Sequence, residues 1–160
     1  RERETGKTYL ALVLGQWPTS KKVLDKPLHK YLLADGERRV KVVAKDDPDG
    51  MPSLTLVKPR PTRGQDFSLL EVTIKTGRTH QIRVHLANEG HPIAGDDKYG
   101  DFDQNKALMR VVNGPALKRM YLHAWRLQFN HPATGNRIEL LAPLPLELEA
   151  FSDHAAPPIV

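Results

Sequence analysis

The sequence of 160 residues predicts an α+β fold that is built on a mostly antiparallel mixed sheet with few helices. Three observations favour this class. Several short segments alternate apolar and polar residues and are bounded by turn-forming residues, which is typical of strands. A stretch near the middle has the apolar spacing of an amphipathic helix. Near the C-terminus, two strand-like segments flank a turn at residues 130–136, a pattern that indicates a β-hairpin.

The first expected strand runs from Lys7 to Gly15. Both of its faces are apolar, which predicts a central strand that is covered on both sides. Trp17 and Pro18 end it. The next segment, residues 21–36, is polar with a short apolar insert, and we expect it to be a connection.

Three more strands are expected over residues 37–45, 53–58 and 67–75. The first of these carries basic residues on one face, including Lys41. Binding to a polyanionic partner would explain that face. A solvated edge strand, on which lysine prevents pairing with another chain, would explain it as well. The third segment alternates apolar and polar residues, so we expect a half-buried strand that leads into the central stretch.

The central stretch, residues 76–100, is dense in turn-forming and charged residues around a helical core. Thr79 is placed to cap a helix whose first turn is residues 80–83, and Gly90 with Pro92 ends it. At about 100° per residue, one broad arc of this helix is apolar. The arc holds Ile82, Val84, Leu86 and Ala87, and the rest of the wheel holds Gln81, His85, Asn88 and Glu89.

Arg83 falls in the middle of the apolar arc, which is the unusual feature of this helix. An unpaired buried charge is very costly, so an inward guanidinium needs a carboxylate or phosphate partner. One interpretation is that Arg83 orients a catalytic carboxylate or holds a nucleic-acid phosphate. The helical wheel alone favours the other interpretation, a structural ion pair or a side chain that extends past its neighbours to water.

The last third of the chain predicts a weak strand or short helix at 108–112, then the hairpin. Its first strand, 121–129, is expected to turn Trp125, Leu127 and Phe129 inward, with Arg126 and Gln128 outward, and its second strand is 138–142. A short final helix is expected over 146–151. Without an interdomain linker or repeat, residues 1–154 predict one domain, followed by a frayed tail at 155–160.

The composition and the absence of certain motifs argue against several kinds of site. The formal net charge of +5 suits a polyanionic partner but is also common without one. The absence of cysteine excludes disulfides and thiolate chemistry, and no apolar run is long enough to span a membrane. The sequence has no GxSxG and no HExxH pattern, and His80 and His85 are spaced to diverge on a helix, so we expect neither a serine hydrolase nor a metal site.

The string GRTHQIRVHLANEGHPIAGDDKYG, residues 77–100, resembles the signature of the RluA/RluC-type pseudouridine synthases, which modify uridines in structured RNA. Residues 7–13 resemble the family's strand that carries an active-site tyrosine. Residues 121–124 and 129–135 resemble its late hairpin. The end of the central string, 94–101, is similar to the RluC-like branch, which acts on large-subunit ribosomal RNA.

The resemblance implies an incomplete pseudouridine synthase catalytic fold. The family's nucleophilic aspartate lies in an HRLDxxTSG-type motif that this sequence does not contain. We therefore expect the chain to be the C-terminal part of a catalytic domain, with the missing N-terminal half as its partner and no activity alone. The implied substrate is uridine in large-subunit ribosomal RNA, the implied location is cytoplasmic, and the chemistry requires neither metal nor organic cofactor.

The resemblance also assigns roles to particular residues. It implies that Tyr9 stacks on the target base and takes part in the C5 proton step, that Arg83 pairs with the aspartate, and that Leu122 forms an apolar wall of the uracil pocket. Core packing explains Tyr9 and Leu122 as well. Candidate RNA contacts are Arg78, His80, Gln81 and Lys41.

Two other functions are compatible with the same residues. One is an RNA-binding module without catalysis, and the other is a scaffold in which Arg83 closes an ion pair in the core. Because the strand at Lys7–Gly15 is apolar on both faces, we also expect an exposed apolar patch where the missing half packs.

Overall fold

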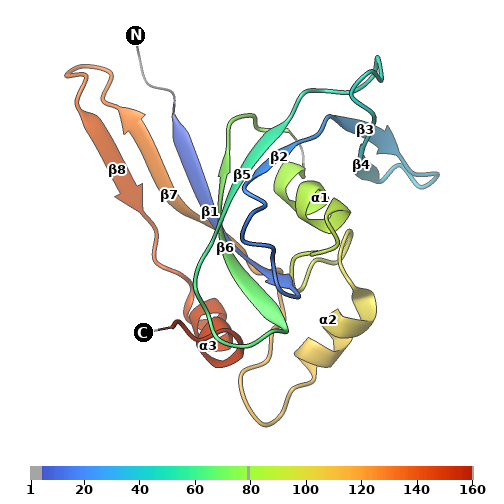
Figure 1. Ribbon diagram of the computed structural model, residues 1–160, viewed down its shortest axis with the longest axis vertical. Coiled ribbons are helices and arrows are strands. Elements are labelled where there is room, and N and C mark those ends of the chain that lie inside the picture. Colours follow the sequence, from blue (N-terminus) through green and yellow to red (C-terminus); the bar gives the residue numbers. More distant parts are fainter. Residues whose placement is uncertain (1–4, 79, 160) are drawn as a thin grey trace.

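The computed structural model describes residues 5–78 and 80–159 (Figure 1). The strands and helices follow one another as β1 (Gly6–Leu14), β2 (Val23–Asp25), β3 (Leu28–Leu32), β4 (Arg38–Val42), β5 (Leu54–Pro59), β6 (Phe67–Ile74), α1 (Gln81–Asn88), α2 (Phe102–Met109), β7 (Leu122–Asn130), β8 (Arg137–Leu141) and α3 (Leu146–Ala155). The predicted α+β class is confirmed.

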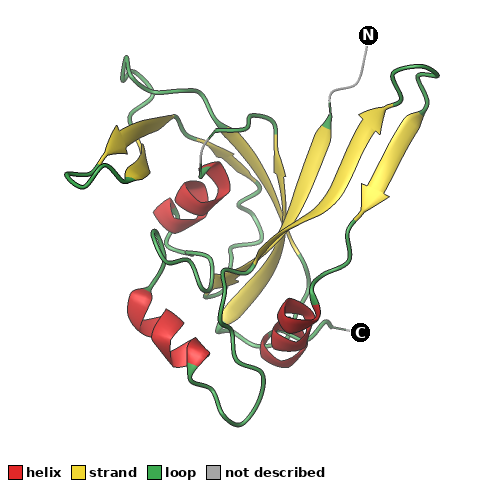
Figure 2. Cartoon of the chain, turned by 180° about the vertical axis from the view of Figure 1, so that it is seen from behind, coloured by secondary structure: helices red, strands yellow, loops and turns green. Residues whose placement is uncertain are grey.

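Within the described residues, the main sheet has six strands in the order β2-β5-β6-β1-β7-β8. Strands β3 and β4 form a separate two-stranded ribbon beside α1 (Figure 1). Every pairing between these strands is antiparallel, as the sequence predicts for most of the sheet. Figure 2 shows the same sheet from behind, with the helices beside its strands.

Strand β1 is central, and its residues from Leu10 to Val13 are at most 1% exposed. On one face, Ala11 and Val13 belong to a core cluster with α1. On the other face, Leu12 packs in a cluster that includes residues of α2 and α3. The prediction of a strand covered on both sides is confirmed. The sequence predicts an exposed apolar patch because both faces of this strand are apolar. That reasoning is wrong, because the chain itself covers both faces of the strand.

Exposed apolar residues lie on several elements, among them the β7–β8 hairpin. Leu140 and Leu141 are 53% and 58% exposed, and the hairpin extends past the helices (Figure 1). The predicted inward and outward alternation of β7 is wrong, because Trp125, Leu127 and Arg126 are all half-buried. Strand β7 pairs with β1 on one side and with β8 on the other, and from Trp125 onward its side chains are half-buried on both faces.

The segment 21–36, expected to be a connection, contains β2 and β3. Each strand has one buried anchor, Leu24 at 2% and Leu28 at 2% exposure. Strands of three and five residues are too short to show a clear alternation, which is why the sequence pattern missed them.

The expected weak element at 108–112 is replaced by helix α2, which begins earlier. Asp101 caps it, because its side chain accepts a hydrogen bond from the Gln104 N–H at 3.0 Å. Helix α3 extends to Ala155, beyond the expected end at residue 151.

The C-terminal residues through 159 are bound to the loop after β5. The Arg63 N–H donates to the Pro157 carbonyl at 2.7 Å, the Ile159 N–H donates to the Pro61 carbonyl at 3.2 Å, and Ala156 is 2% exposed. The expectation of a frayed tail is therefore wrong over 155–159, while a domain boundary at residue 154 stays a prediction.

The segment after α1 continues the central sheet at the C-terminal end of β1. The Ala94 N–H donates to the Leu12 carbonyl at 2.9 Å, and the Tyr121 N–H donates to the Ala94 carbonyl at 2.9 Å. These bonds fix the position of the loop at 95–100, whose Asp96 pairs with Arg83 of α1. None of the described helices is long and apolar enough to cross a membrane.

Candidate active site

A cleft of about 220 Å³ lies between the start of α1 and the strands β1 and β7. Its lining consists of Tyr9, Ile74, Arg78, His80, Gln81, Ile82, Arg83 and Leu122. In the antiparallel register, Tyr9 pairs with Ala124 and Ala11 pairs with Leu122, so Tyr9 and Leu122 share a face of the sheet. The cleft therefore brings together the three residues to which the resemblance assigns catalytic roles.

Arg83 projects from α1 and forms a bidentate ion pair with Asp96. Its Nε donates to Oδ2 at 2.9 Å and its Nη2 donates to Oδ1 at 2.6 Å. The side chain of Arg83 is 13% exposed and that of Asp96 is 0% exposed. Asp97, which is 88% exposed, adds a weak contact at 3.5 Å.

The expectation that Arg83 awaits an acid from outside the chain is corrected by this pair. The partner is local, as in the structural ion-pair alternative, and the hydrogen bond with Asp96 raises the pKa of Arg83 above its usual value. The pair is nevertheless not remote from Tyr9, since Arg83 and Tyr9 line the same cleft. The Nη1 atom of Arg83 has no hydrogen-bond partner among the described residues and is not among the buried atoms that lack one.

Asp96 is held by the turn that contains it. The backbone N–H groups of Lys98 and Tyr99 donate to its Oδ1 at 2.9 and 3.1 Å. Burial acts to raise the pKa of Asp96, but the hydrogen bonds from Arg83 and from these two N–H groups outweigh it and hold the pKa below its usual range. Asp96 is therefore a carboxylate. It lies within the string 77–100 that resembles the family signature, but its spacing from Arg83 in the sequence does not reveal the ion pair.

The turn requires glycine at two positions. A Cβ on Gly100 would lie 2.2 Å from the Asp96 carbonyl oxygen, and a Cβ on Gly95 would lie 2.4 Å from the Arg119 carbonyl oxygen. Gly95 also has a φ of 84°, which L side chains rarely adopt. The close approach of these backbones places Asp96 against Arg83.

His80 precedes α1 in a left-handed conformation, with φ 54° and ψ 19°. The helix begins at Gln81, one residue later than expected, and His80 makes no side-chain cap. The predicted Thr79 cap lies outside the described residues. His80 bonds through Nδ1 to the Tyr99 hydroxyl at 2.7 Å, and burial, followed by the charges of Arg83 and Lys98, lowers its pKa.

Gln81 and His85 are buried, at 2% and 1% exposure, although the wheel places them outside the apolar arc. The Gln81 amide donates to the Leu54 carbonyl at 2.9 Å and to the Thr55 hydroxyl at 3.0 Å. His85 bonds to the Thr55 hydroxyl at 2.7 Å and to the Lys26 carbonyl at 2.8 Å. These bonds satisfy buried polar groups and attach α1 to β5.

This burial bears on the role expected for Gln81. The Thr76 hydroxyl and the Arg78 N–H donate to the Gln81 side-chain oxygen at 2.7 and 3.1 Å. The amide is thus fully engaged within the chain, and a direct contact with RNA does not fit its environment. The wheel missed this because it weighs polarity alone and contains nothing about partners on another strand.

Arg78 and Lys41 lie towards the β3–β4 ribbon. Arg78 is half-buried, donates from Nε to the Pro52 carbonyl at 3.1 Å, and borders both the cleft and a neighbouring groove of about 180 Å³ that Lys30 also lines. Lys41 is exposed on β4, with its Nζ 5.4 Å from the centre of the Tyr31 ring. Lys41 is therefore outside the cleft, and Arg78 joins the cleft to the groove.

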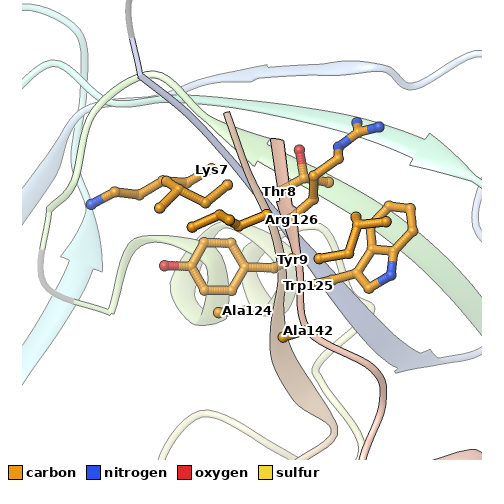
Figure 3. A pocket seen from close by; sticks show the side chains of 10 residues that line it. Lys7, Thr8, Tyr9, Ala124, Trp125, Arg126 and Ala142 are labelled. Carbon is orange, nitrogen blue, oxygen red and sulfur yellow. The ribbon is translucent and has the colours of Figure 1, made fainter. Parts of the chain in front are cut away.

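A larger hollow of about 340 Å³ adjoins Tyr9 on the β7–β8 side (Figure 3). Ala124, Trp125, Leu140, Leu141 and Ala142 give it a largely apolar lining. Trp125 sits at an irregularity where the register with β1 shifts between Thr8 and Tyr9. Tyr9 thus lines both this hollow and the cleft.

No group of three or more His, Asp and Glu side chains within the described ranges is arranged to hold a metal ion.

Several known proteins are similar to this chain. Residues 1–88 match the model of the RNA pseudouridylate synthase family. Ribosomal large subunit pseudouridine synthase C of Salmonella typhi is 44% identical over 149 residues, which are 93% of this chain and 44% of that protein. The Escherichia coli (strain K12) protein of the same name is 44% identical over 144 residues, which are 90% of this chain and 43% of that protein. The chain therefore spans less than half the length of these relatives.

Two human structures share the fold. Human RNA Pseudouridylate Synthase Domain Containing 1 aligns with a TM-score of 0.68 at 28% identity and covers 88% of this chain and 55% of its own. Human RNA Pseudouridylate Synthase Domain Containing 4 aligns with a TM-score of 0.68 at 23% identity, covering 94% of this chain and 62% of its own, and shows the fold alone. From the family match over more than half of its residues, the chain belongs to the RNA pseudouridylate synthase family.

Proposed function

We propose that the chain is the C-terminal part of the catalytic domain of an RNA pseudouridine synthase that acts on uridine in large-subunit ribosomal RNA. The observation that carries the proposal is the meeting of Tyr9, Arg83 and Leu122 in one cleft. The names of the relatives support the choice of ribosomal RNA as substrate. A substrate of this kind supports a cytoplasmic location.

The roles follow the resemblance, with one change that the structure requires. Tyr9 stacks on the extruded base and Leu122 forms the apolar wall beside it. Arg83 is already fixed by Asp96 through Nε and Nη2, so an incoming carboxylate has Nη1 as its donor. We assign the nucleophilic aspartate to a segment outside these 160 residues, and place it against that nitrogen.

In the proposed reaction, the aspartate is ionised because the guanidinium stabilises its charged form. It initiates cleavage of the N1–C1′ bond of uridine, and the base turns and is rejoined to C1′ through C5. The proton on C5 then leaves and N1 gains a proton, which restores the uracil ring. Asp96 contributes by holding the guanidinium in place before the substrate arrives, so that no reorganisation is needed during the reaction.

Tritium release from RNA labelled at uridine C5 tests this assignment. The 160-residue chain alone should release no tritium, whereas the full-length protein should release it. In the full-length protein, Tyr9→Phe and Arg83→Met should both reduce release, while Asp97→Asn, at an 88% exposed position, should not. Turnover by the 160-residue chain alone would refute the assignment of the nucleophile to another segment.

We further propose that the β3–β4 ribbon and Arg78 contact RNA phosphates. Lys41 on β4 is exposed, and Arg78 with Lys30 borders the groove that leads to the cleft. Lys41→Glu and Arg78→Glu should weaken RNA binding, and each lost phosphate contact should reduce the slope of log affinity against log salt by about 1. Lys106→Glu on α2, which lies away from the ribbon in Figure 1, is the control.

An RNA-binding module without catalysis is the second candidate, because the basic ribbon lies outside the cleft of Tyr9 and Arg83. The two experiments separate the candidates. Loss of binding in the charge-reversal variants, together with no tritium release by the full-length protein, would favour the binding module.

The apolar hollow beside Tyr9 suggests where the rest of the catalytic domain packs. Leu140 and Leu141 are more than half exposed, and the relatives are more than twice as long as the chain. We propose that the N-terminal half covers this hollow. Amide hydrogen exchange of β8 should be slower in the full-length protein than in the 160-residue chain, and equal rates would contradict the placement.

A further inference from the structure

Tyr99 connects the β3–β4 ribbon to the cleft through its hydroxyl group. The Val40 N–H of β4 donates to the Tyr99 hydroxyl oxygen at 3.0 Å. The same oxygen lies 2.7 Å from His80 Nδ1, and the two rings meet edge to face with centres 5.4 Å apart. Tyr99 therefore contacts the ribbon through Val40 and the cleft lining through His80.

The first hydrogen bond favours one direction for the second. A backbone N–H can only donate, so Tyr99 accepts from Val40. The hydroxyl hydrogen is then free to donate to His80 Nδ1. If Nδ1 accepts a hydrogen bond, the proton of a neutral imidazole is on Nε2.

The two other protonation states of His80 are less favourable. A proton on Nδ1, in either the opposite tautomer or the cation, would direct a second donor at the Tyr99 oxygen. The hydroxyl hydrogen would then have no acceptor among the described residues.

The surrounding charge also opposes the cation. Arg83 and Arg39 lie 5.2 and 5.8 Å from the centre of the Tyr99 ring. Burial lowers the pKa of His80 most, and the charges of Arg83, Lys98 and Arg39 lower it further against the opposing charge of Asp96.

The remaining nitrogen of His80 is available to a ligand. Nε2 has no hydrogen-bond partner in the described part of the chain and is not a buried unsatisfied atom. His80 lines the cleft with Tyr9 and Arg83. The backbone of His80 is left-handed, which costs a non-glycine residue about 1–2 kcal/mol. The surrounding structure holds it in that conformation.

We propose that Tyr99 is a positioning residue that holds His80 as the neutral Nε2–H tautomer, so that the cleft presents a fixed donor to an acceptor oxygen of bound RNA. The part of this proposal that concerns RNA rests on the proposed function. The part that concerns the tautomer rests on the hydrogen bonds of Tyr99 alone. The donor complements the guanidinium of Arg83, because it is directional and carries no net charge.

The tautomer can be measured directly on the 160-residue chain by long-range proton–nitrogen NMR correlations of ¹⁵N-labelled histidine. At neutral pH, the His80 signals should show an unprotonated Nδ1 and a protonated Nε2. In Tyr99→Phe, which keeps the ring and removes the hydroxyl, they should shift towards a mixture of tautomers. Tyr31→Phe, in the exposed part of the ribbon, should leave them unchanged. A protonated Nδ1 in the unsubstituted chain would overturn the proposal.

The second arm uses the full-length protein and labelled RNA. His80→Gln places an amide N–H near the position of Nε2, whereas His80→Asn places its amide near that of Nδ1. We expect KM to rise on the order of fivefold in Tyr99→Phe and in His80→Asn, and less in His80→Gln, with kcat changing little. Equal KM values for the Gln and Asn variants would overturn the role of the donor. Absence of tritium release by the unsubstituted protein would instead refute the proposed function and leave the NMR result to decide the tautomer.

Discussion

The ion pair between Arg83 and Asp96 allows a sharp prediction about stability. Asp96→Asn keeps the size of the side chain but removes the charge, so that Arg83 loses its counterion and an amide N–H faces the guanidinium. Removing one partner of a buried ion pair destabilises proteins by about 3–5 kcal/mol. The Asp96 side chain is 0% exposed and that of Arg83 is 13% exposed, and Asp97 gives Arg83 a weak alternative partner.

Because Arg83 is slightly exposed and has this alternative partner, we expect the loss of folding stability to lie near the lower end of that range, at about 3 kcal/mol. With a slope of about 2 kcal/mol per molar urea, the unfolding midpoint should fall by about 1.5 M. Asp97→Asn is the matched control, because its side chain is 88% exposed and its contact is 3.5 Å long. Its effect should stay within about 0.5 kcal/mol.

A double-mutant cycle with Arg83→Met identifies the source of the loss. If the unpaired guanidinium is responsible, Asp96→Asn should destabilise the Arg83→Met background much less than the unsubstituted chain. The pH dependence adds an independent check. Because the folded-state pKa of Asp96 is lowered, its stabilising effect is present above the unfolded value, about 3.8, and is lost as pH falls through the folded value. A midpoint in Asp96→Asn that matches the unsubstituted chain would refute this account of the site.

Two further predictions concern the supports of the cleft. Burial lowers the pKa of His85, so the unfolded chain binds a proton that the folded chain excludes, and stability should fall as pH drops below about 6.5. In His85→Gln, the urea midpoints measured at about pH 5 and about pH 7.5 should differ less than they do in the unsubstituted chain. His80 accounts for the pH dependence that remains. An unchanged difference between the two midpoints would contradict the assignment to His85. Gly100→Ala should destabilise the chain by more than about 1 kcal/mol, because the added Cβ meets the Asp96 carbonyl at 2.2 Å. Gly77→Ala, where nothing lies within 4 Å, is the control, and equal melting temperatures for the two variants would show that the close approach does not matter.

The parts of the fold that could be read from the sequence are those with a long periodic pattern. The strand at Lys7–Gly15 was recognised as central because it is apolar on both faces, and β6 and the late hairpin were recognised from alternation and turn residues. Elements without such a pattern were missed. Strand β2 has three residues, and helix α2 depends on the Asp101 cap and on one buried residue, Leu108.

The candidate site divides in the same way. The helical pattern shows that Arg83 interrupts an apolar face, and the resemblance implies Tyr9, Arg83 and Leu122 as a set. The pairing of Arg83 with Asp96 becomes visible only in the folded chain. Sequence spacing could not reveal this, because the contact requires the backbone turn around Gly95 and Gly100 and the seating of that turn against β1.

The buried polar side chains show the physical reason most clearly. A periodic pattern reports how polar one face of an element is, but the burial of a polar group depends on whether another element supplies its hydrogen-bond partner. Gln81 and His85 read as solvent-facing on the helix alone. They are buried because Thr55, on a strand distant in the sequence, bonds to both of them.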